Sequence, residues 1–146
     1  MKFLIGLSLL FAFTPSINSQ EMLHKKRAHE IGLKVGILTP GPYNAITDVK
    51  GVSVGHTTLI EGDSIRTGVT VILPHNGNIF QEKLPAAVYV GNGFGKMIGT
   101  TQIMELGNIE SPIALTNTLN APKVADALIS YTLSQSSNEN VRSVNV

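Results

Sequence analysis

The fold is decided by two neighbouring stretches, Thr39-Pro-Gly-Pro-Tyr-Asn-Ala-Ile-Thr-Asp-Val-Lys-Gly-Val-Ser-Val-Gly-His-Thr-Thr58 and Arg66-Thr-Gly-Val-Thr-Val-Ile-Leu-Pro74. At the start of the first, two prolines remove backbone donors and favour an extended entry, and the glycine between them allows a turn. Asp48 is expected to close an Asx turn ahead of Gly51. Apolar residues then alternate with small and polar ones, as they do in a strand. The two stretches therefore predict a turn-rich entry followed by β-strands.

Apolar runs separated by turn sequences predict the strands of the fold. The expected strands are Val52–Ile60, Val69–Leu73, Ala86–Val90 and Ile113–Thr116. Gly, Pro, Asn and Asp lie between them, and these residues favour turns. Helix signals occur in the same part of the chain, so the sequence predicts an α/β protein.

Three segments carry helix signals. Thr100 or Thr101 is expected to cap a helix that runs through Leu106 and stops at Gly107. Pro122 suits the first turn of another helix that extends to about Leu133. The face expected to be buried on that helix consists of Val124, Ala127, Leu128 and Tyr131. Near the start of the chain, Glu21–Leu33 predicts a short helix or a partly ordered arm.

Composition excludes several classes of function. The 146 residues suit one domain, and the formal net charge is only +1. A nearly neutral chain lacks the electrostatic footprint for nucleic acid or an anionic membrane, so we expect neither as a partner. The chain contains no cysteine, which excludes disulfides, a thiolate nucleophile and zinc–cysteine sites.

The first residues are typical of an export signal. Lys2 gives a positive start, Phe3–Phe13 is apolar, and Ser19 offers a small residue at a cleavage point before Gln20. The apolar run is shorter than the roughly 20 residues that a membrane-spanning helix needs. We therefore expect residues 1–19 to be a signal peptide and the mature protein to be exported, to the periplasm or out of the cell.

The other end of the sequence predicts a continuation. Residues 134–140 form a polar loop, and Val141-Arg-Ser-Val-Asn-Val146 then opens a new β-prone stretch. A domain rarely ends on the opening residues of a core strand. We therefore expect the chain to be the N-terminal piece of a longer protein.

The glycine-rich segment Val88-Tyr-Val-Gly-Asn-Gly-Phe-Gly-Lys-Met-Ile-Gly-Thr-Thr101 could place backbone amides around an anion. A Walker loop would need glycine and serine or threonine where Val90 and Met97 stand. The dinucleotide pattern fails as well, because Lys96 and Ile98 occupy the places of its third glycine. A ligand-lining loop and a tight strand-to-helix connection both remain open, since glycines serve either role.

The histidines and serines form no other site. No His-Glu-x-x-His motif occurs, and His56 within a strand is better explained as a structural imidazole. Ser53, Ser64 and Ser111 lack the setting of a nucleophile elbow.

Three motifs in order make the chain resemble the L-aminopeptidase/D-esterase and β-peptidyl aminopeptidase family. The opening block Thr39–Thr58 is the first, the glycine stretch Asn92–Gly99 the second, and Thr116-Asn-Thr118 at the end of a strand the third. Asp126-Ala127 matches the family's helix. Leu119-Asn-Ala-Pro122 departs from the family pattern, and this departure bears on the polarity of the pocket and hence on substrate preference.

The resemblance implies a layered α/β/β/α sandwich similar to N-terminal-nucleophile hydrolases, with residues 20–146 as the N-terminal part of one catalytic domain. It implies a precursor that cleaves itself before a serine, and this nucleophile is expected beyond Val146, so no catalytic residue is assigned here and residues 1–146 alone are expected to be inactive. Substrates would be short peptides, amides or esters. The partners would be the missing C-terminal half (the β subunit) and further copies in a homo-oligomer. No metal or cofactor is implied.

The same resemblance suggests where substrate would bind. Asn92 and Gly93 belong to the loop that would line the cleft. Glu105 could pair with the substrate ammonium group or be a solvated helix carboxylate. Asn117 could donate its amide to a substrate carbonyl or cap its loop, and Leu119 would lie beside it.

Two other interpretations stay open. The first is an acyltransferase similar to the ornithine acetyltransferase group, which also matures by self-cleavage. The second is a secreted binding domain without catalysis.

Overall fold

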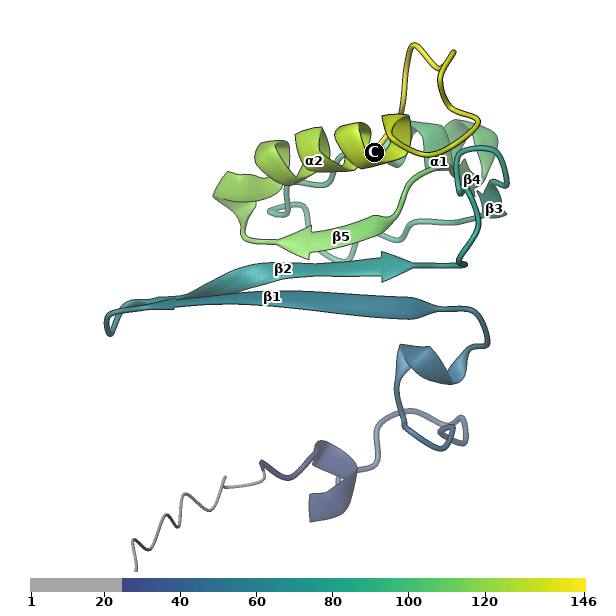
Figure 1. The fold of residues 1–146 in the computed structure, drawn as a ribbon. Helices are drawn as coiled ribbons and strands as arrows, with labels where there is room; N and C mark the ends of the chain where they lie inside the picture. The colour runs from purple at the N-terminus through teal and green to yellow at the C-terminus, as the bar shows by residue number, and fades with distance from the viewer. Residues whose placement is uncertain (1–24) are drawn as a thin grey trace, which may run out of the picture. The chain divides into compact units, whose positions relative to one another are not determined.

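The computed structural model describes residues 25–146, which fall into two compact units, one ending at Leu38 and one spanning Thr39–Val146 (Figure 1). The predicted signal peptide, residues 1–19, lies outside the described residues. In the first unit the predicted helix or arm over Glu21–Leu33 contains a short 3₁₀ helix, η1 (Ala28–Ile31). Gly32 ends it with φ of 84°, a conformation that favours glycine.

The second unit begins with a turn that Asp48 organises. Its carboxylate accepts hydrogen bonds from the Tyr43 amide at 3.0 Å and the Ala45 amide at 3.1 Å, and it ends η2 (Ile46–Asp48). The prediction that Asp48 closes an Asx turn before Gly51 is therefore wrong. Its carboxylate accepts from amides that come before Asp48 in the chain, not after it. A Cβ at Gly41 would lie 2.5 Å from the carboxylate, so only glycine fits there.

The main sheet has three antiparallel strands in the order β1-β2-β5. They are β1 (Ser53–Glu61), β2 (Ile65–Leu73) and β5 (Ile113–Thr116). β5 has the predicted bounds, and β1 is shifted by one residue. β2 starts four residues before the predicted Val69, because residues 65–68 pair with β1 across the hairpin although their own sequence is a weak strand signal.

A second sheet pairs β3 (Leu84–Pro85) with β4 (Asn108–Ile109). The strand predicted for Ala86–Val90 is wrong, since none of these described residues is assigned to a strand. An apolar run forms a strand only where a neighbour pairs with its backbone over several residues, and here the pairing beyond β3 stops after one bond, from the Ala86 amide to the Gly107 carbonyl.

Both predicted helices of the second unit are present. α1 (Thr100–Leu106) ends at Gly107 as predicted, but neither threonine caps it: Gly99 precedes it in a left-handed conformation without a side-chain cap. α2 (Ala121–Leu133) has Pro122 in its first turn and follows the short 3₁₀ helix η3 (Thr118–Asn120).

The buried face of α2 is rotated from the predicted one. Ala127 and Tyr131 are exposed, whereas Ala125 and Thr132 are partly or fully buried beside Val124 and Leu128. The predicted set was therefore wrong in half of its members, because α2 meets β5 along one side only (Figure 1).

After α2 the polar loop predicted for residues 134–140 is present and closes on Asn138, which is 1% exposed. The predicted strand over Val141–Val146 is wrong, as the structure assigns no strand there. In place of a strand ladder, the Asn145 amide of this segment donates to the Glu110 side chain.

Few side chains are fully enclosed. Among residues 25–146, Ile79 and Pro112 are the apolar residues that are buried, although 42% of the sequence is hydrophobic. Within the same described range, no helix is both long and apolar enough to cross a membrane.

Candidate functional site

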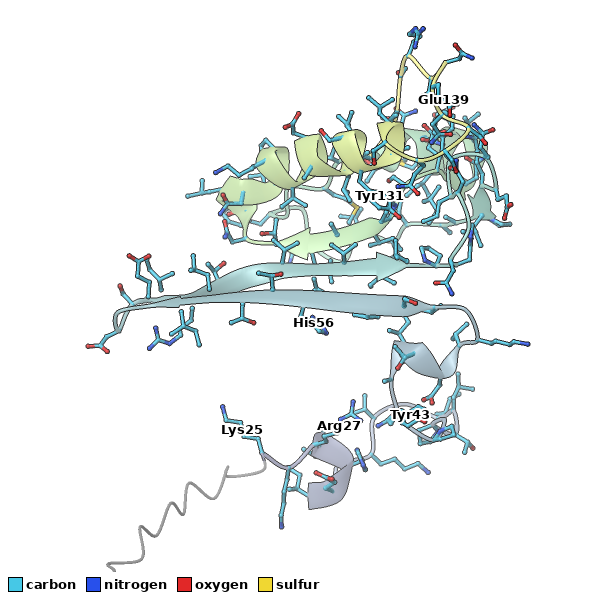
Figure 2. All side chains as sticks on the ribbon, viewed as in Figure 1. Lys25, Arg27, Tyr43, His56, Tyr131 and Glu139 are labelled. Atoms are coloured by element: carbon cyan, nitrogen blue, oxygen red, sulfur yellow. The ribbon has the colours of Figure 1, made fainter. Side chains whose placement is uncertain are left out.

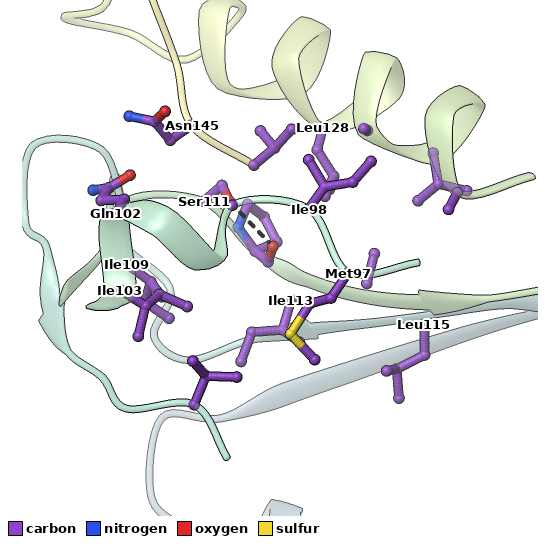
Figure 3. Close-up of a pocket in the computed structure, with 18 of the residues that line it drawn as sticks. Met97, Ile98, Gln102, Ile103, Ile109, Ser111, Ile113, Leu115, Leu128 and Asn145 are labelled. Atoms are coloured by element: carbon purple, nitrogen blue, oxygen red, sulfur yellow. Dashed lines mark hydrogen bonds between the residues drawn. The ribbon is translucent and has the colours of Figure 1, made fainter. Parts of the chain in front are cut away.

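A cavity of about 470 Å³ lies between the two helices and the β4–β5 segment (Figure 3). The glycine turn at 95–99 leads into α1 on one side, and α2 lies on the other. Residues 145–146 complete the wall. Loops and helices therefore form most of the lining, and strand residues come only from β4 and β5.

Apolar side chains dominate the walls. Met97 and Ile98 come from the glycine turn, Ile113 and Leu115 from β5, and Leu128 from α2 (Figure 3). A concave apolar surface with a few polar groups is the usual form of a site for small molecules. It is equally the form of a core that another segment of protein completes.

The polar end of the cavity is built around Glu110, whose side chain is 8% exposed. Its Oε2 accepts from the Lys83 ammonium at 2.8 Å and from the Gln102 amide at 3.2 Å. Its Oε1 accepts from the backbone amide of Asn145 at 2.9 Å. Both oxygens of the buried carboxylate are thus satisfied.

These contacts set the ionisation of the carboxyl. Burial on its own would raise the pKa of Glu110, but the hydrogen bonds from Lys83 and from the Asn145 amide, together with the Lys83 charge and Gln102, outweigh it. The pKa is therefore held below its ordinary value of 4.5. Glu110 is an anion at neutral pH and acts as an acceptor.

The glycine turn approaches the last residue of the chain closely at Gly99. Its φ is +77°, and a Cβ built there would lie 2.6 Å from the Val146 carbonyl oxygen. Further back in the turn, Asn92 accepts from the Phe94 amide at 3.1 Å, and the Lys96 ammonium lies 4.7 Å from the centre of the Phe94 ring. The loop is therefore ordered by its own side chains.

The substrate-binding residues predicted from the sequence lie outside the cavity lining. Asn92, Gly93 and Glu105 are exposed, and Leu119 is 92% exposed. Asn117 caps η3 by accepting from the Asn120 amide at 3.1 Å, and it donates to Thr67 Oγ1 at 2.9 Å. The five residues come from the glycine turn, from α1 and from the segment after β5. In the described part of the chain no hydrogen bond joins any of these three groups to another, and their binding roles stay predictions.

Glu110 is the residue that sequence reasoning missed. It stands in Ile109-Glu-Ser-Pro-Ile113, where a single charge interrupts an apolar run. A charge in such a place is either at an edge or buried with a partner, and that signal could have found it. Its partner Lys83 is 27 residues away, so the pairing itself could not be predicted.

His56 has the structural role that the sequence favoured. It lies on β1 (Figure 2), and its Nδ1 is 2.9 Å from Thr70 Oγ1 on β2. Within the described part of the chain, no group of three or more His, Asp or Glu residues is arranged to hold a metal ion.

Comparison with known proteins places this geometry in a family. The model of peptidase family S58 matches residues 44–146. The β-peptidyl aminopeptidase BapA of Sphingosinicella xenopeptidilytica is 39% identical over 136 residues, which cover 88% of this chain and 33% of the relative. This chain therefore spans about a third of the length of that relative.

Solved structures similar to this chain support the same family. The PH0078 protein of Pyrococcus horikoshii OT3 superposes with a TM-score of 0.75 and 48% identity, over 82% of this chain and 37% of that one. The L-aminopeptidase D-Ala-esterase/amidase of Ochrobactrum anthropi gives 0.67 and 34%, over 81% and 35%. That enzyme is described as a prototype for the serine aminopeptidases and a new variant of the Ntn hydrolase fold. The predicted α/β fold, part of a sandwich similar to Ntn hydrolases, is confirmed.

Proposed function

Because the chain belongs to peptidase family S58, we propose that the whole protein is a serine aminopeptidase acting on short peptides, amides or esters. The observation that carries this proposal is the match over residues 44–146, which includes the glycine turn, α1 and the Thr116-Asn-Thr118 motif. The match favours a hydrolase over the acyltransferase and over the binding domain without catalysis. The chain spans about a third of its curated relative, so the activity belongs to a larger protein.

The nucleophile is a serine in the part of the protein beyond residue 146, exposed when the precursor cleaves itself. Its hydroxyl attacks the substrate carbonyl while its own α-amine takes the hydroxyl proton. The proton then passes to the leaving amine or alcohol, and an acyl-enzyme remains. Water hydrolyses this ester and regenerates the serine. Hydrogen-bond donors around the carbonyl stabilise the oxyanion that forms in each step.

The residues of this chain bind substrate in that scheme. Glu105 pairs with the free ammonium group of the N-terminal residue. Asn117 donates an amide to a substrate carbonyl, and the loop at Asn92 and Gly93 lines the cleft beside Leu119. Their exposure supports these roles, because a ligand can reach them.

The remaining part of the protein is a partner of this chain. The apolar cavity and the scarcity of buried apolar side chains in residues 25–146 support a second segment that covers them. About two thirds of the length of the matched relative is available for this. A homo-oligomer of the assembled protein is proposed as well.

Expression of the complete coding sequence tests the function. Mass spectrometry should find two fragments, the second starting with serine, and the protein should hydrolyse an aminoacyl amide. Changing that serine to alanine should abolish both processing and turnover. A single intact chain that hydrolyses no aminoacyl amide would refute the proposal.

We also propose that the protein is exported, because Lys2, the apolar run Phe3–Phe13 and Ser19 match a signal peptide. Sequencing the N-terminus of periplasmic or secreted protein should give Gln20 or a residue close to it. An intact Met1 on soluble protein from the cytoplasm would argue against export.

A further inference from the structure

We propose that Glu110 is a positioning residue that holds residues 145–146 against the start of α1 and thereby sets the shape of the cavity wall. The proposal deepens the proposed function and rests on it, since the cavity is taken as part of the aminopeptidase. The role is distinct from binding substrate, because both carboxylate oxygens are already occupied by groups of the protein.

The two carboxylate oxygens of Glu110 accept from different segments of the chain. Oε2 takes the Lys83 ammonium and the Gln102 amide, which come from the loop before β3 and from α1. Oε1 takes the Asn145 backbone amide at 2.9 Å, with the Asn145 side-chain amide at 3.5 Å. The carboxylate therefore joins the segment 141–146 to α1 through one side chain.

Among residues 25–146, no other part that is distant in the sequence forms a hydrogen bond with this segment. Val141 and Arg142 bond only to the loop carbonyls of residues 138–141, a few positions away. Residues 141–146 also lack the ladder of a strand. Glu110 is therefore the hydrogen-bonding anchor of the segment to distant parts of the fold.

A second, independent contact lies at the adjacent residue. The Val146 carbonyl sits over Gly99, so close that a Cβ there would be 2.6 Å from its oxygen. Gly99 is the residue that precedes α1, and Gln102 in the first turn of α1 bonds Glu110. The two contacts thus hold two successive residues, Asn145 and Val146, at the N-terminal end of α1.

We call the contacts of Glu110 with Asn145 and of Gly99 with Val146 the seat of residues 145–146. The Glu110 contact requires a carboxylate. A glutamine side chain has one acceptor oxygen. It could accept from the Asn145 amide or from the Lys83 and Gln102 donors, but not from both groups at once. In Glu110→Gln the amide NH₂ would face donors on the side that it occupies, and the Lys83 ammonium would lose its counter-charge. A charge-assisted contact of this kind is worth more than a neutral hydrogen bond.

Hydrogen exchange of the whole protein, followed by mass spectrometry, tests the seat directly. In Glu110→Gln the peptide covering residues 141–146 should exchange about tenfold faster, because the Asn145 amide loses its acceptor. Peptides from β1 and β2 should keep their protection. The exposed Glu61→Gln should match the wild type throughout. Unchanged exchange of residues 141–146 in Glu110→Gln would overturn the proposal.

If Glu110→Gln loses protection everywhere, Asn145→Pro decides, because it removes the backbone and side-chain amide donors of residue 145 and leaves Glu110 paired with Lys83 and Gln102. Selective loss in residues 141–146 supports the seat, and wild-type protection there overturns it.

Gly99→Ala tests the second contact, with Gly107→Ala as the matched control. Both glycines flank α1 at positive φ, +77° and +66°, but nothing lies within 4 Å of a Cβ at Gly107. Both variants therefore introduce backbone strain, and only Gly99→Ala collides with Val146. Protection of residues 141–146 should fall in Gly99→Ala alone. Equal behaviour of the two variants would show that the segment is not seated on Gly99.

Turnover of an aminoacyl amide by the same samples separates the two proposals. A wild-type protein that hydrolyses nothing refutes the aminopeptidase, while the exchange data still decide the role of Glu110. An active wild type whose segment exchanges alike in all variants refutes the seat alone.

Discussion

Glu110 is a buried carboxylate whose negative charge is stabilised by three separate segments of the chain. Burying such a charge without partners costs several kcal/mol. Here Lys83 supplies the counter-charge, and two amides complete the shell. Removing one partner is therefore expected to cost more than the pair contributes by itself, because the charge that remains is buried and unpaired.

Glu110 makes stability depend on pH in a definite direction. Its pKa is depressed in the folded protein, so its contribution is present above the unfolded value near 4.5 and is lost as the pH falls through the lower folded pKa. From about pH 5 to about pH 3, the Tm of the wild type should fall more steeply than that of Glu110→Gln. Thermal melts at several pH values measure this. Parallel curves for the two proteins would contradict it.

Glu105 is predicted to recognise the free amine of the substrate. Glu105→Gln in the complete enzyme should weaken substrates with a free ammonium roughly 30-fold or more in kcat/KM, since losing one partner of a partly desolvated charge pair costs about 2–5 kcal/mol. Self-cleavage should survive, because the scissile bond of the precursor has no ammonium there. An aminoacyl amide, its N-acetylated analogue and a processing gel provide the readouts. Equal loss on both substrates would assign Glu105 to the fold instead.

Among the elements, the β1–β2 hairpin depends on a close approach of two backbones. Gly68 on β2 lies so near the Thr57 carbonyl of β1 that an added Cβ would collide with it. Thr116 Oγ1 of β5 donates to the Gly68 carbonyl at 3.1 Å, so the same residue also touches the third strand. The register of the sheet is therefore pinned at this glycine.

Gly68→Ala should destabilise the protein by about 1–3 kcal/mol through overpacking. Gly55→Ala on β1 is the matched control, because nothing lies within 4 Å of a Cβ there. The control should be neutral or more stable by about 0.5 kcal/mol, as alanine loses less entropy than glycine in a strand. Urea unfolding of the complete protein compares them. Equal stability of the two variants would show that the strands can separate to admit the methyl group.

Asn138 holds the loop after α2 by hydrogen bonds to the loop at residues 78–81 and to the end of α2. Its side chain accepts from Asn78 at 3.0 Å and Gln81 at 2.8 Å, and it donates to the Thr132 carbonyl at 2.7 Å. Asn138→Ala should cost about 3 kcal/mol, because the buried Thr132 carbonyl and the amides of Asn78 and Gln81 lose their partner together. The exposed Asn140→Ala should leave the Tm unchanged. A wild-type Tm in Asn138→Ala would mean that water replaces the side chain.

At the scale of the whole molecule, residues 25–146 enclose little of their apolar surface. The cavity, the outer edge of β1 and many apolar side chains remain open to solvent. Open strand edges and apolar patches of this kind favour association with other polypeptide. The remaining part of the protein is the partner that we propose for them.

Residues 1–146 expressed alone should therefore be poorly soluble or partly unfolded, and inactive. Co-expression with the rest of the coding sequence should restore a soluble complex. Size-exclusion chromatography, thermal melts and binding of a hydrophobic dye measure this. A monodisperse monomer with a sharp cooperative melt would contradict the proposed covering of the cavity.

The sequence by itself determined the local elements that carry strong signals. The β5 strand was predicted from an apolar run between turn residues, the end of α1 from the preference of glycine for helix ends, and the start of α2 from the geometry of Pro122. Three motifs were enough to indicate the family. These signals were readable because each depends on residues that are neighbours in the chain.

Tertiary structure alone decided the rest. Residues 65–68 became strand because β1 pairs with them, while the backbone of Ala86–Val90 is paired only at Ala86 among the described residues and forms no strand. Glu110 gained its role from Lys83, 27 positions away, and from the Asn145 amide. Pairing and burial depend on which segments meet in space, and no local pattern contains that information.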